Sequence, residues 1–172
     1  MSGAYILLQF GADFSDIRFE DLEGRLAFTV KKVEENPNLI LKVTREAPWA
    51  QRHPDIMGPN SSFLYFGPSR MPGYLVYGNS SPQPMANARK QKKDYSTSRY
   101  FHAQSGTEYK WRLAPQRLEC VDNKGAIMAV WETADADDEF HARLTVKHAG
   151  LAIVTELVTT LLLNRIAQSW SW

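Results

Sequence analysis

The stretch that decides the fold is residues 150–168, which read GLAIVTELVTTLLLNRIAQ. On an α-helix, with about 100° between residues, its apolar positions surround the axis instead of forming one stripe. Such a helix is stable in water only when other elements enclose it. Its length at about 1.5 Å per residue, about 28 Å, is close to the diameter of a small domain. The sequence therefore predicts a helix threaded through a β-structure, with Leu157, Leu161 and Leu162 nearly fully buried.

Two other structures fit parts of this stretch. A membrane span needs roughly 20 mainly apolar residues, and Glu156, Asn164 and Arg165 interrupt the run. Two buried strands would suit the β-branched residues, but no turn residue separates them between positions 151 and 163. The buried helix is therefore favoured. A carboxylate inside it needs a cation or several donors, so we expect Glu156 near one end of the barrel or paired with Arg or Lys.

Upstream of this helix, residues 17–146 read as short runs with strand composition and a period of two. Three hairpins are predicted, the first turning at Gly24, which supplies a positive φ. Their strands are residues 17–19 with 26–30, 99–102 with 109–113, and 118–121 with 127–131. In residues 109–113 the apolar side chains alternate with Lys110 and Arg112, which indicates a half-buried sheet.

The middle of the chain is less regular. Residues 48–95 hold seven of the nine prolines, so we expect edge strands and loops there and no uninterrupted central strand. Residues 79–98 are predicted to form a mobile basic loop, because the segment is polar, contains prolines and then becomes densely charged. This loop interrupts a single domain, residues 1–172, without dividing it.

Composition limits the possible functions. Lys and Arg number 20 and Asp and Glu 19, for a net charge of +1, so a general nucleic-acid binder is disfavoured and an electrostatic partner must use a local patch. The single cysteine, Cys120, excludes a disulfide framework and a cysteine-based zinc site. It is interpreted as a small buried hydrophobe. No secretory signal is visible. We expect a cytoplasmic protein, with peripheral membrane attachment as an option.

The order of the predicted elements resembles a known superfamily. Short strands, an acidic turn, a strand at 140–146, Gly150 and an apolar terminal helix are similar to the end of the tubby-like superfamily, which includes tubby C-terminal domains, LURP-one-related proteins and phospholipid scramblases. The chain is most similar to an uncharacterised fungal family of that superfamily, in residues 19–30, 106–111, 129–131 and the terminal helix. The resemblance spans most of the chain outside the proline-rich middle. It implies a closed antiparallel β-barrel of about twelve strands around a central hydrophobic C-terminal α-helix, and it contains no catalytic motif.

Basic side chains gather in and beside the predicted loop. The candidate headgroup-binding residues are Arg89, Lys90, Lys92, Lys93 and Arg99. These five cations against Asp94 leave +4 within eleven residues. With roughly 1 kcal/mol from each cation near an anionic membrane, the patch predicts weak, salt-sensitive attachment of about 4 kcal/mol. Tubby domains use basic residues for phosphoinositide headgroups, so the resemblance implies a ligand of that class. A solvated charged loop without a ligand also fits.

Other titratable residues form no catalytic or metal motif. The acidic turn at residues 135–139 lacks the glycine and the spaced glutamate of a calcium loop, so we interpret it as a solvated turn. The histidines have no paired spacing and no nearby nucleophile motif, although histidines on adjacent strands could converge with carboxylates. They are His53, His102, His141 and His148. We therefore predict no catalytic residue, metal or cofactor. Trp170 and Trp172 are expected to plug one barrel end, with a partner groove or a membrane interface as alternatives.

These observations predict a binding module that is not an enzyme. It attaches weakly to anionic membrane lipids or phosphoinositides through the basic loop, and it does not bind nucleic acid. One alternative is a small-ligand carrier or an enzyme with a pocket in the barrel wall. Another is a protein-interaction scaffold, for which an exposed apolar patch would be the signature.

Overall fold

The computed structural model describes residues 3–172 and builds them around one twelve-stranded antiparallel sheet. Its strands are β1 (Ala4–Phe10), β2 (Asp16–Asp21), β3 (Leu26–Glu34), β4 (Ile40–Arg45), β5 (Ser61–Tyr65), β6 (Tyr74–Tyr77), β7 (Gln83–Pro84), β8 (Ser98–His102), β9 (Glu108–Leu113), β10 (Arg117–Asp122), β11 (Ile127–Thr133) and β12 (Ala142–Lys147). Their spatial order is β7-β6-β5-β4-β3-β2-β1-β12-β11-β10-β9-β8. Strands that follow one another in the chain therefore pair, except β7 and β8, which are the two edges of the sheet, and the first and last strands, β1 and β12, pair as well.

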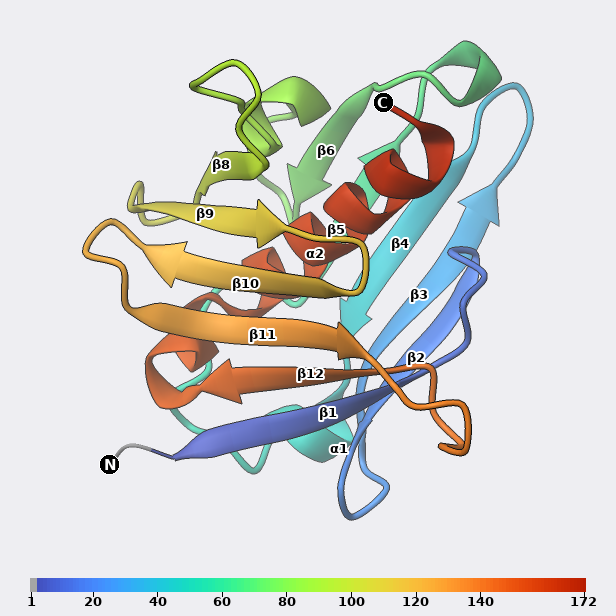
Figure 1. Ribbon diagram of the computed structural model, residues 1–172. Coiled ribbons are helices and arrows are strands. Elements are labelled where there is room, and N and C mark those ends of the chain that lie inside the picture. Colours follow the sequence, from blue (N-terminus) through green and yellow to red (C-terminus); the bar gives the residue numbers. More distant parts are fainter. Residues whose placement is uncertain (1–2) are drawn as a thin grey trace.

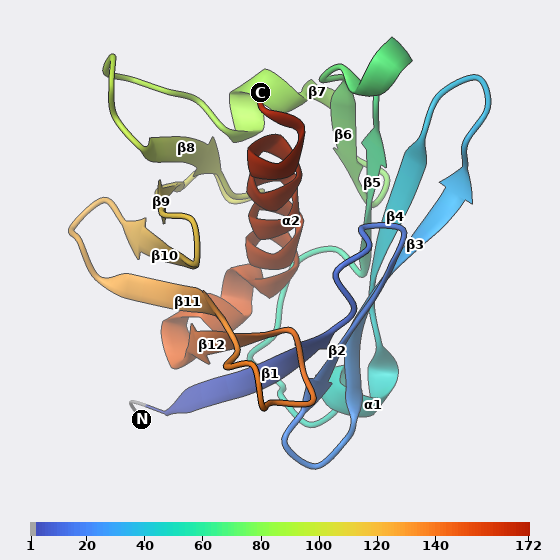
Figure 2. The same ribbon diagram turned by 45° about the vertical axis from the view of Figure 1, so that its right-hand side comes forward.

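The sheet bends into two wings that face each other across the terminal helix. The helices are α1 (Ala47–Ala50), the short 3-10 helices η1 (Pro68–Arg70), η2 (Met85–Ala88) and η3 (His148–Ile153), and α2 (Val154–Trp170). One wing contains β8–β12 and the other β2–β6, with β1 between them (Figure 1). Helix α2 rises between the two wings, as the turned view also shows (Figure 2).

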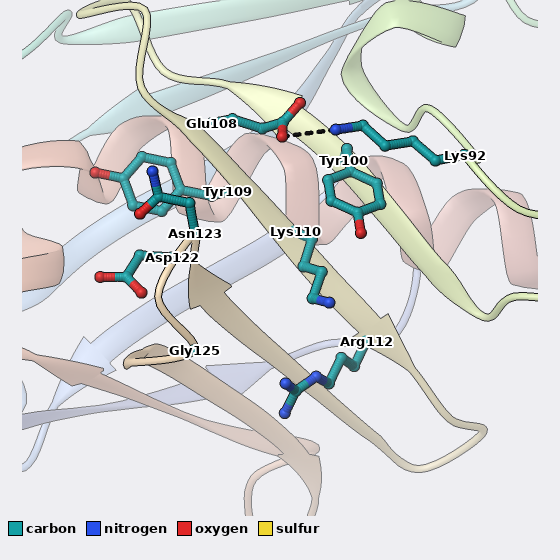
Figure 3. Close-up of a pocket in the computed structure, with 9 residues that line it drawn as sticks. All are labelled: Lys92, Tyr100, Glu108, Tyr109, Lys110, Arg112, Asp122, Asn123 and Gly125. Carbon is teal, nitrogen blue, oxygen red and sulfur yellow. Dashed lines mark hydrogen bonds and ion pairs between the residues drawn. The ribbon is translucent and has the colours of Figure 1, made fainter.

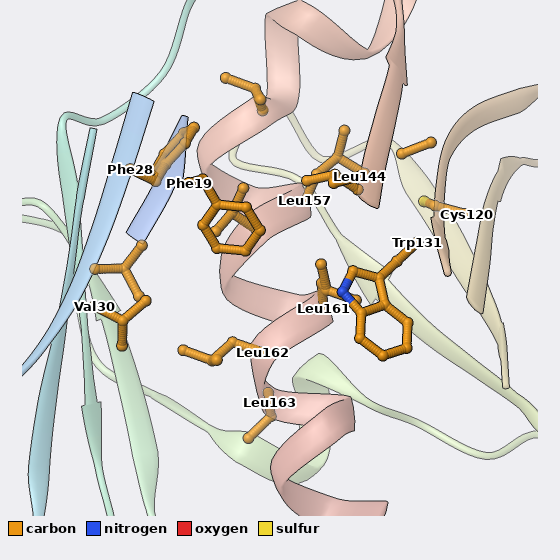
Figure 4. Close-up of a cluster of buried hydrophobic side chains, with 14 of the residues drawn as sticks. Phe19, Phe28, Val30, Cys120, Trp131, Leu144, Leu157, Leu161, Leu162 and Leu163 are labelled. Carbon is orange, nitrogen blue, oxygen red and sulfur yellow. The ribbon is translucent and has the colours of Figure 1, made fainter. Parts of the chain in front are cut away.

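Helix α2 is the centre of the core. Every residue at 153–164 is buried, and the exposed fractions of Leu157, Leu161 and Leu162 are 0%, 2% and 5%. Side chains reach the helix from both wings, with Phe28 and Val30 on one side and Cys120 and Trp131 on the other (Figure 4). The prediction of a buried terminal helix is confirmed.

The polar residues of α2 find partners on the strands around it. The indole N–H of Trp111 donates a hydrogen bond to Thr160 Oγ1 at 2.8 Å. The hydroxyls of Ser62 and Thr159 are 2.7 Å apart. Residues His148–Trp170 are long and apolar enough to cross a bilayer, with a mean hydropathy of 1.4 over 18 residues, but 83% of that window is buried inside the protein. In the folded protein this segment is therefore a core helix.

The prediction of a closed barrel is wrong in one respect. The edge strands β7 and β8 are not hydrogen-bonded to each other. Helix η2 lies in the gap, with Met85 and Ala88 buried, and one isolated bridge joins Lys90 to Tyr100. Strand β7 ends at Pro84, which has no N–H for a further ladder bond. We call residues 83–100, which run from β7 through η2 into the first half of β8, the seam.

The predicted hairpins are confirmed, and the proline-rich middle is more regular than expected. Strands β2 and β3 pair around Gly24, whose φ is +80°, and β8–β9 and β10–β11 also pair. Within the middle, β5 pairs on both sides, with β4 and β6. The five residues of β5 contain no proline, so the flanking prolines do not interrupt its ladders. Residues 79–98 include β7 and η2, and their mobility stays a prediction.

Candidate functional site

The C-terminal end of α2 and the seam enclose a groove. One part has a volume of about 370 Å³ and is lined by Pro72, Met85, Ala86, Arg89, Lys90, Gln91, Arg99 and Trp172. An adjoining, shallower hollow of about 660 Å³ shares Pro72 and Trp172 and is also lined by Ser69, Arg70, Met71, Ser169, Trp170 and Ser171. We call the two together the C-terminal groove. It contains three of the five predicted headgroup-binding residues.

The backbone bridge across the seam brings these three cations together. The N–H of Lys90 donates to the carbonyl of Tyr100 at 2.9 Å, and the N–H of Tyr100 donates to the carbonyl of Lys90 at 2.8 Å. Arg89 and Arg99 precede these paired residues in the chain. The side chain of Lys90 is exposed, whereas those of Arg89 and Arg99 are half-buried.

Arg89 is attached to the core helix. Its Nε donates to Oδ1 of the buried Asn164 at 3.3 Å, and Asn164 Nδ2 donates to the Thr160 carbonyl at 2.9 Å. Burial, and then the positive charge of Arg99, lower the pKa of Arg89 to about 10. The guanidinium is still charged at neutral pH. Sequence reasoning did not anticipate this attachment, because Asn164 is remote in the chain.

No acidic side chain balances these charges. Within residues 3–172, Arg89, Lys90 and Arg99 form no ion pair. No Asp or Glu of that range lines the groove. The positive charge of Arg99 disfavours the protonated form of Arg89, and with no carboxylate in the groove the two arginines favour an anionic ligand.

The opposite wall of the groove is apolar. Trp170 packs against the buried Phe66, with ring centroids 5.1 Å apart, and Trp172 lies 6.1 Å from the same ring. The Arg70 guanidinium lies 5.0 Å from the Trp170 ring centroid, and its carbonyl accepts a 2.9 Å hydrogen bond from Trp172 Nε1. Met71 beside it is 57% exposed. The two tryptophans thus cover the end of α2 and line the groove at the same time.

Two predicted residues lie outside the groove. Lys92 forms a 2.7 Å ion pair with Glu108 in a separate pocket of about 280 Å³ on β8–β10, where Lys110 and Arg112 also extend (Figure 3). Lys93 is exposed and lines neither site. Arg70 lines the groove but was not predicted. Arg70 is far from the basic loop in the sequence, so no sequence pattern linked the two. Only the fold brings η1 to the end of α2.

Comparison with known proteins gives a distant likeness. No family model matches the chain, and no curated protein matches it. Among solved structures, the chain is similar to an X-ray structure of a protein from Arabidopsis thaliana. The two are 10% identical with a TM-score of 0.40, over 92% of this chain and 88% of that chain. This likeness names no family.

The other titratable residues form no metal centre. No group of three or more His, Cys, Asp or Glu in residues 3–172 could hold a metal ion. The acidic turn is exposed and closed on itself, since the N–H of Asp135 donates to Asp138 Oδ2 at 2.9 Å. His148 lies 3.1 Å from Asp55, and His102 lies 3.7 Å from Glu108. Cys120 is buried as predicted.

Glu156 occupies a buried position in the first turn of α2. It is 2% exposed, and its Oε2 accepts a 3.1 Å hydrogen bond from the N–H of Gln104 in the β8–β9 turn. Oε1 has no hydrogen-bond partner in the described chain. Burial raises the pKa of Glu156, against smaller lowering effects from the Gln104 N–H and from Arg45. The expected place near one end of the sheet is confirmed, but Glu156 forms no ion pair within residues 3–172.

Proposed function

We propose that this chain is a non-enzymatic module that attaches to anionic lipid surfaces through the C-terminal groove. The observation that carries the proposal is the convergence of Arg89, Lys90 and Arg99, without a carboxylate partner, on a groove whose other wall is apolar. Guanidinium groups match phosphate oxygens in charge and geometry. Exposed Met71 and the two tryptophans supply the apolar contact that interfacial binding also requires.

The expected attachment is weak and reversible. Each cation near an anionic membrane surface contributes roughly 1 kcal/mol. Arg70 joins the three predicted residues at the groove, so the electrostatic part is about 4 kcal/mol, and it decreases as salt screens the charges. Tyr95, a fully exposed aromatic residue in the seam, adds a further side chain suited to a membrane interface.

The ligand class we propose is phosphate-bearing lipid headgroups, including phosphoinositides. The antiparallel sheet around a terminal helix supports the resemblance to the tubby-like superfamily, with the open seam as the departure from a closed barrel. Membership of that superfamily and a cytoplasmic, membrane-peripheral location belong to the same proposal.

Vesicle co-sedimentation tests the proposal. The probes are vesicles of phosphatidylcholine alone, and of phosphatidylcholine with phosphatidylserine or with a phosphoinositide, at low and at physiological salt. We expect binding to the anionic vesicles only, and weaker binding at the higher salt. Lys90→Glu is the informative variant because the Lys90 side chain is exposed. It should lower the affinity at least about tenfold, since the change both removes attraction and adds repulsion.

The matched control is Lys124→Glu, which makes the same charge change at the exposed turn between β10 and β11. It should leave vesicle binding unchanged. Absence of binding to anionic vesicles at low salt would overturn the proposal. So would equal losses in the two variants, because net charge and not the groove would then determine attachment.

A further inference from the structure

Another cavity lies between the C-terminal half of α2 and the turn that joins β1 to β2. Its volume is about 150 Å³. Its apolar wall includes Phe19, Val158, Leu161 and Leu162, all of them buried, and the half-buried Phe14. Figure 4 shows Phe19 close to the part of the helix that carries Leu161 and Leu162. Except for Ser169, its lining residues are different from those of the C-terminal groove.

The polar side of this cavity carries one permanent positive charge. Arg165 is held over the Trp131 ring, 4.3 Å from the centroid, and its Nη1 donates to Gln168 Oε1 at 2.7 Å. Within residues 3–172 Arg165 forms no ion pair, and no Asp or Glu of that range lines the cavity. Burial, and then the charge of Arg165, lower the pKa of His141 on the same cavity. At neutral pH the cavity therefore combines a charged guanidinium with a neutral imidazole.

A further polar side chain, Gln9, holds the wall in place. Gln9 is 7% exposed, its Oε1 accepts a hydrogen bond from Trp131 Nε1 at 2.9 Å, and its Nε2 donates to the Gly11 carbonyl at 2.9 Å. Both ends of the amide are thus occupied. In the described chain, no hydrogen bond is made by Arg165 Nε and Nη2, by the His141 ring or by the Ser169 hydroxyl, so these are the groups able to donate to a ligand.

We propose that this cavity binds a small free monocarboxylate of about six carbons in total, most of them in an apolar tail. The carboxylate lies against Arg165, and the tail lies between Phe19 and Leu162. A cavity of this volume holds a molecule of about the size of benzene, which excludes the long acyl chain of a membrane lipid. A planar carboxylate matches the two parallel N–H groups of a guanidinium. The buried wall residues cannot reach a membrane surface, so the ligand is a free acid and the site is independent of the C-terminal groove.

Titration of the full chain with hexanoate, followed by two-dimensional ¹H–¹⁵N NMR, tests this proposal. The His141 ring reports from the cavity itself, and the Trp131 indole N–H reports through its contacts with the lining residues Gln9 and Arg165. We expect saturable shifts at both, with a dissociation constant of about 1 mM for a ligand of this size. Hexanoate should bind about tenfold more tightly than hexanol, and hexylamine should not bind. Butyrate and dodecanoate should both bind more weakly than hexanoate.

Two variants separate the cavity from general surface binding. Ala12→Phe places a ring at the cavity from an exposed turn position, and it should abolish hexanoate binding with an unchanged melting temperature. Arg165→Gln should remove the preference for hexanoate over hexanol. Lys90→Glu should retain hexanoate binding even though it lowers vesicle binding, so the two proposals can fail separately. Equal binding of hexylamine, affinity that rises steadily to dodecanoate, or unchanged binding in Ala12→Phe would overturn the proposal.

Discussion

Two junctions of the sheet contrast with each other. Strands β1 and β12 come from opposite ends of the chain and pair over six register positions, from Ala4 with Lys147 to Gln9 with Ala142. Strands β7 and β8 are the two edges and do not pair. The seam spans the gap between them with η2 and the single bridge between Lys90 and Tyr100.

The difference separates a regular, buried junction from the irregular one at which we propose that the ligand binds. At the first junction, alternating residues of β12 are buried against the core, which fixes the register of the strand. At the seam, β7 ends at Pro84, which has no N–H for a further ladder bond. Residues of this irregular segment, among them Arg89, Lys90 and Arg99, line the C-terminal groove instead. Irregular segments on a rigid scaffold commonly carry binding sites.

The largest effect that we predict is a difference in unfolding free energy between two variants. Each variant shortens one buried side chain, the first in the core around α2 and the second in the seam. Leu161→Ala should lower the free energy of unfolding by about 2–5 kcal/mol, because the sheet around α2 cannot collapse into the cavity. Met85→Ala in η2 should cost at least about 1 kcal/mol less, although Met85 is equally buried, because a short helix between two sheet edges can relax. Urea unfolding measures both. Equal costs, or a Leu161→Ala variant as stable as the parent, would contradict the contrast.

A smaller effect is expected for the hydrogen bonds between the sheet and α2. Thr160→Val keeps the shape of the side chain but leaves the buried indole N–H of Trp111 without its acceptor. We expect a loss of about 1–3 kcal/mol in the free energy of unfolding. Arg99→Gln at the seam should cost less than about 0.5 kcal/mol. If the seam substitution were the more damaging of the two in the same unfolding experiment, the seam would be part of the stabilising core.

The core of this fold could be predicted, and the closure of the sheet could not. The apolar residues of 150–168 have one stable environment, and period-two alternation identifies hairpins, because both signals depend on local burial. Two features of the sheet were not predicted, for different reasons. Strand β1 precedes the segment with clear alternation, and its pairing with β12 is long-range. Whether β7 reaches β8 depends on the geometry of the whole sheet, which no local pattern encodes.

The smallest effect is a pH dependence from Glu156. Burial raises the pKa of this carboxyl above its usual value, so the folded protein retains the proton to a higher pH than the unfolded chain. The resulting stabilisation is complete below the unfolded pKa and is lost as pH rises through the folded pKa. Glu156→Gln should therefore melt a few degrees higher than the parent at about pH 7, and the difference should shrink toward about pH 4. Thermal melts across this range measure it, and a constant difference would contradict the assignment.

The sequence predicted that the candidate site would be basic, but not which individual residues would line it. The density of cations near residue 90 identified the region, and three of the five residues reach the groove. Lys92 does not, because Glu108 on the neighbouring hairpin pairs with it. Arg70 was missed because η1 approaches the seam only in the folded chain. The apolar wall was also invisible as a site, since Trp170 and Trp172 had to be placed by the end of α2 before they could line it.

The central claim is that the seam is the lipid-binding region and the pairing of β1 with β12 is the stable one. Hydrogen–deuterium exchange of the full chain, with and without phosphoinositide vesicles, tests both parts in one measurement. Without vesicles, amides of β1 and β12 should exchange far more slowly than those at residues 85–99. With vesicles, protection should increase at residues 69–72, 85–99 and 169–172 and stay unchanged in β1 and β12. Protection that instead appears around Lys110, with none at the C-terminal groove, would contradict the account.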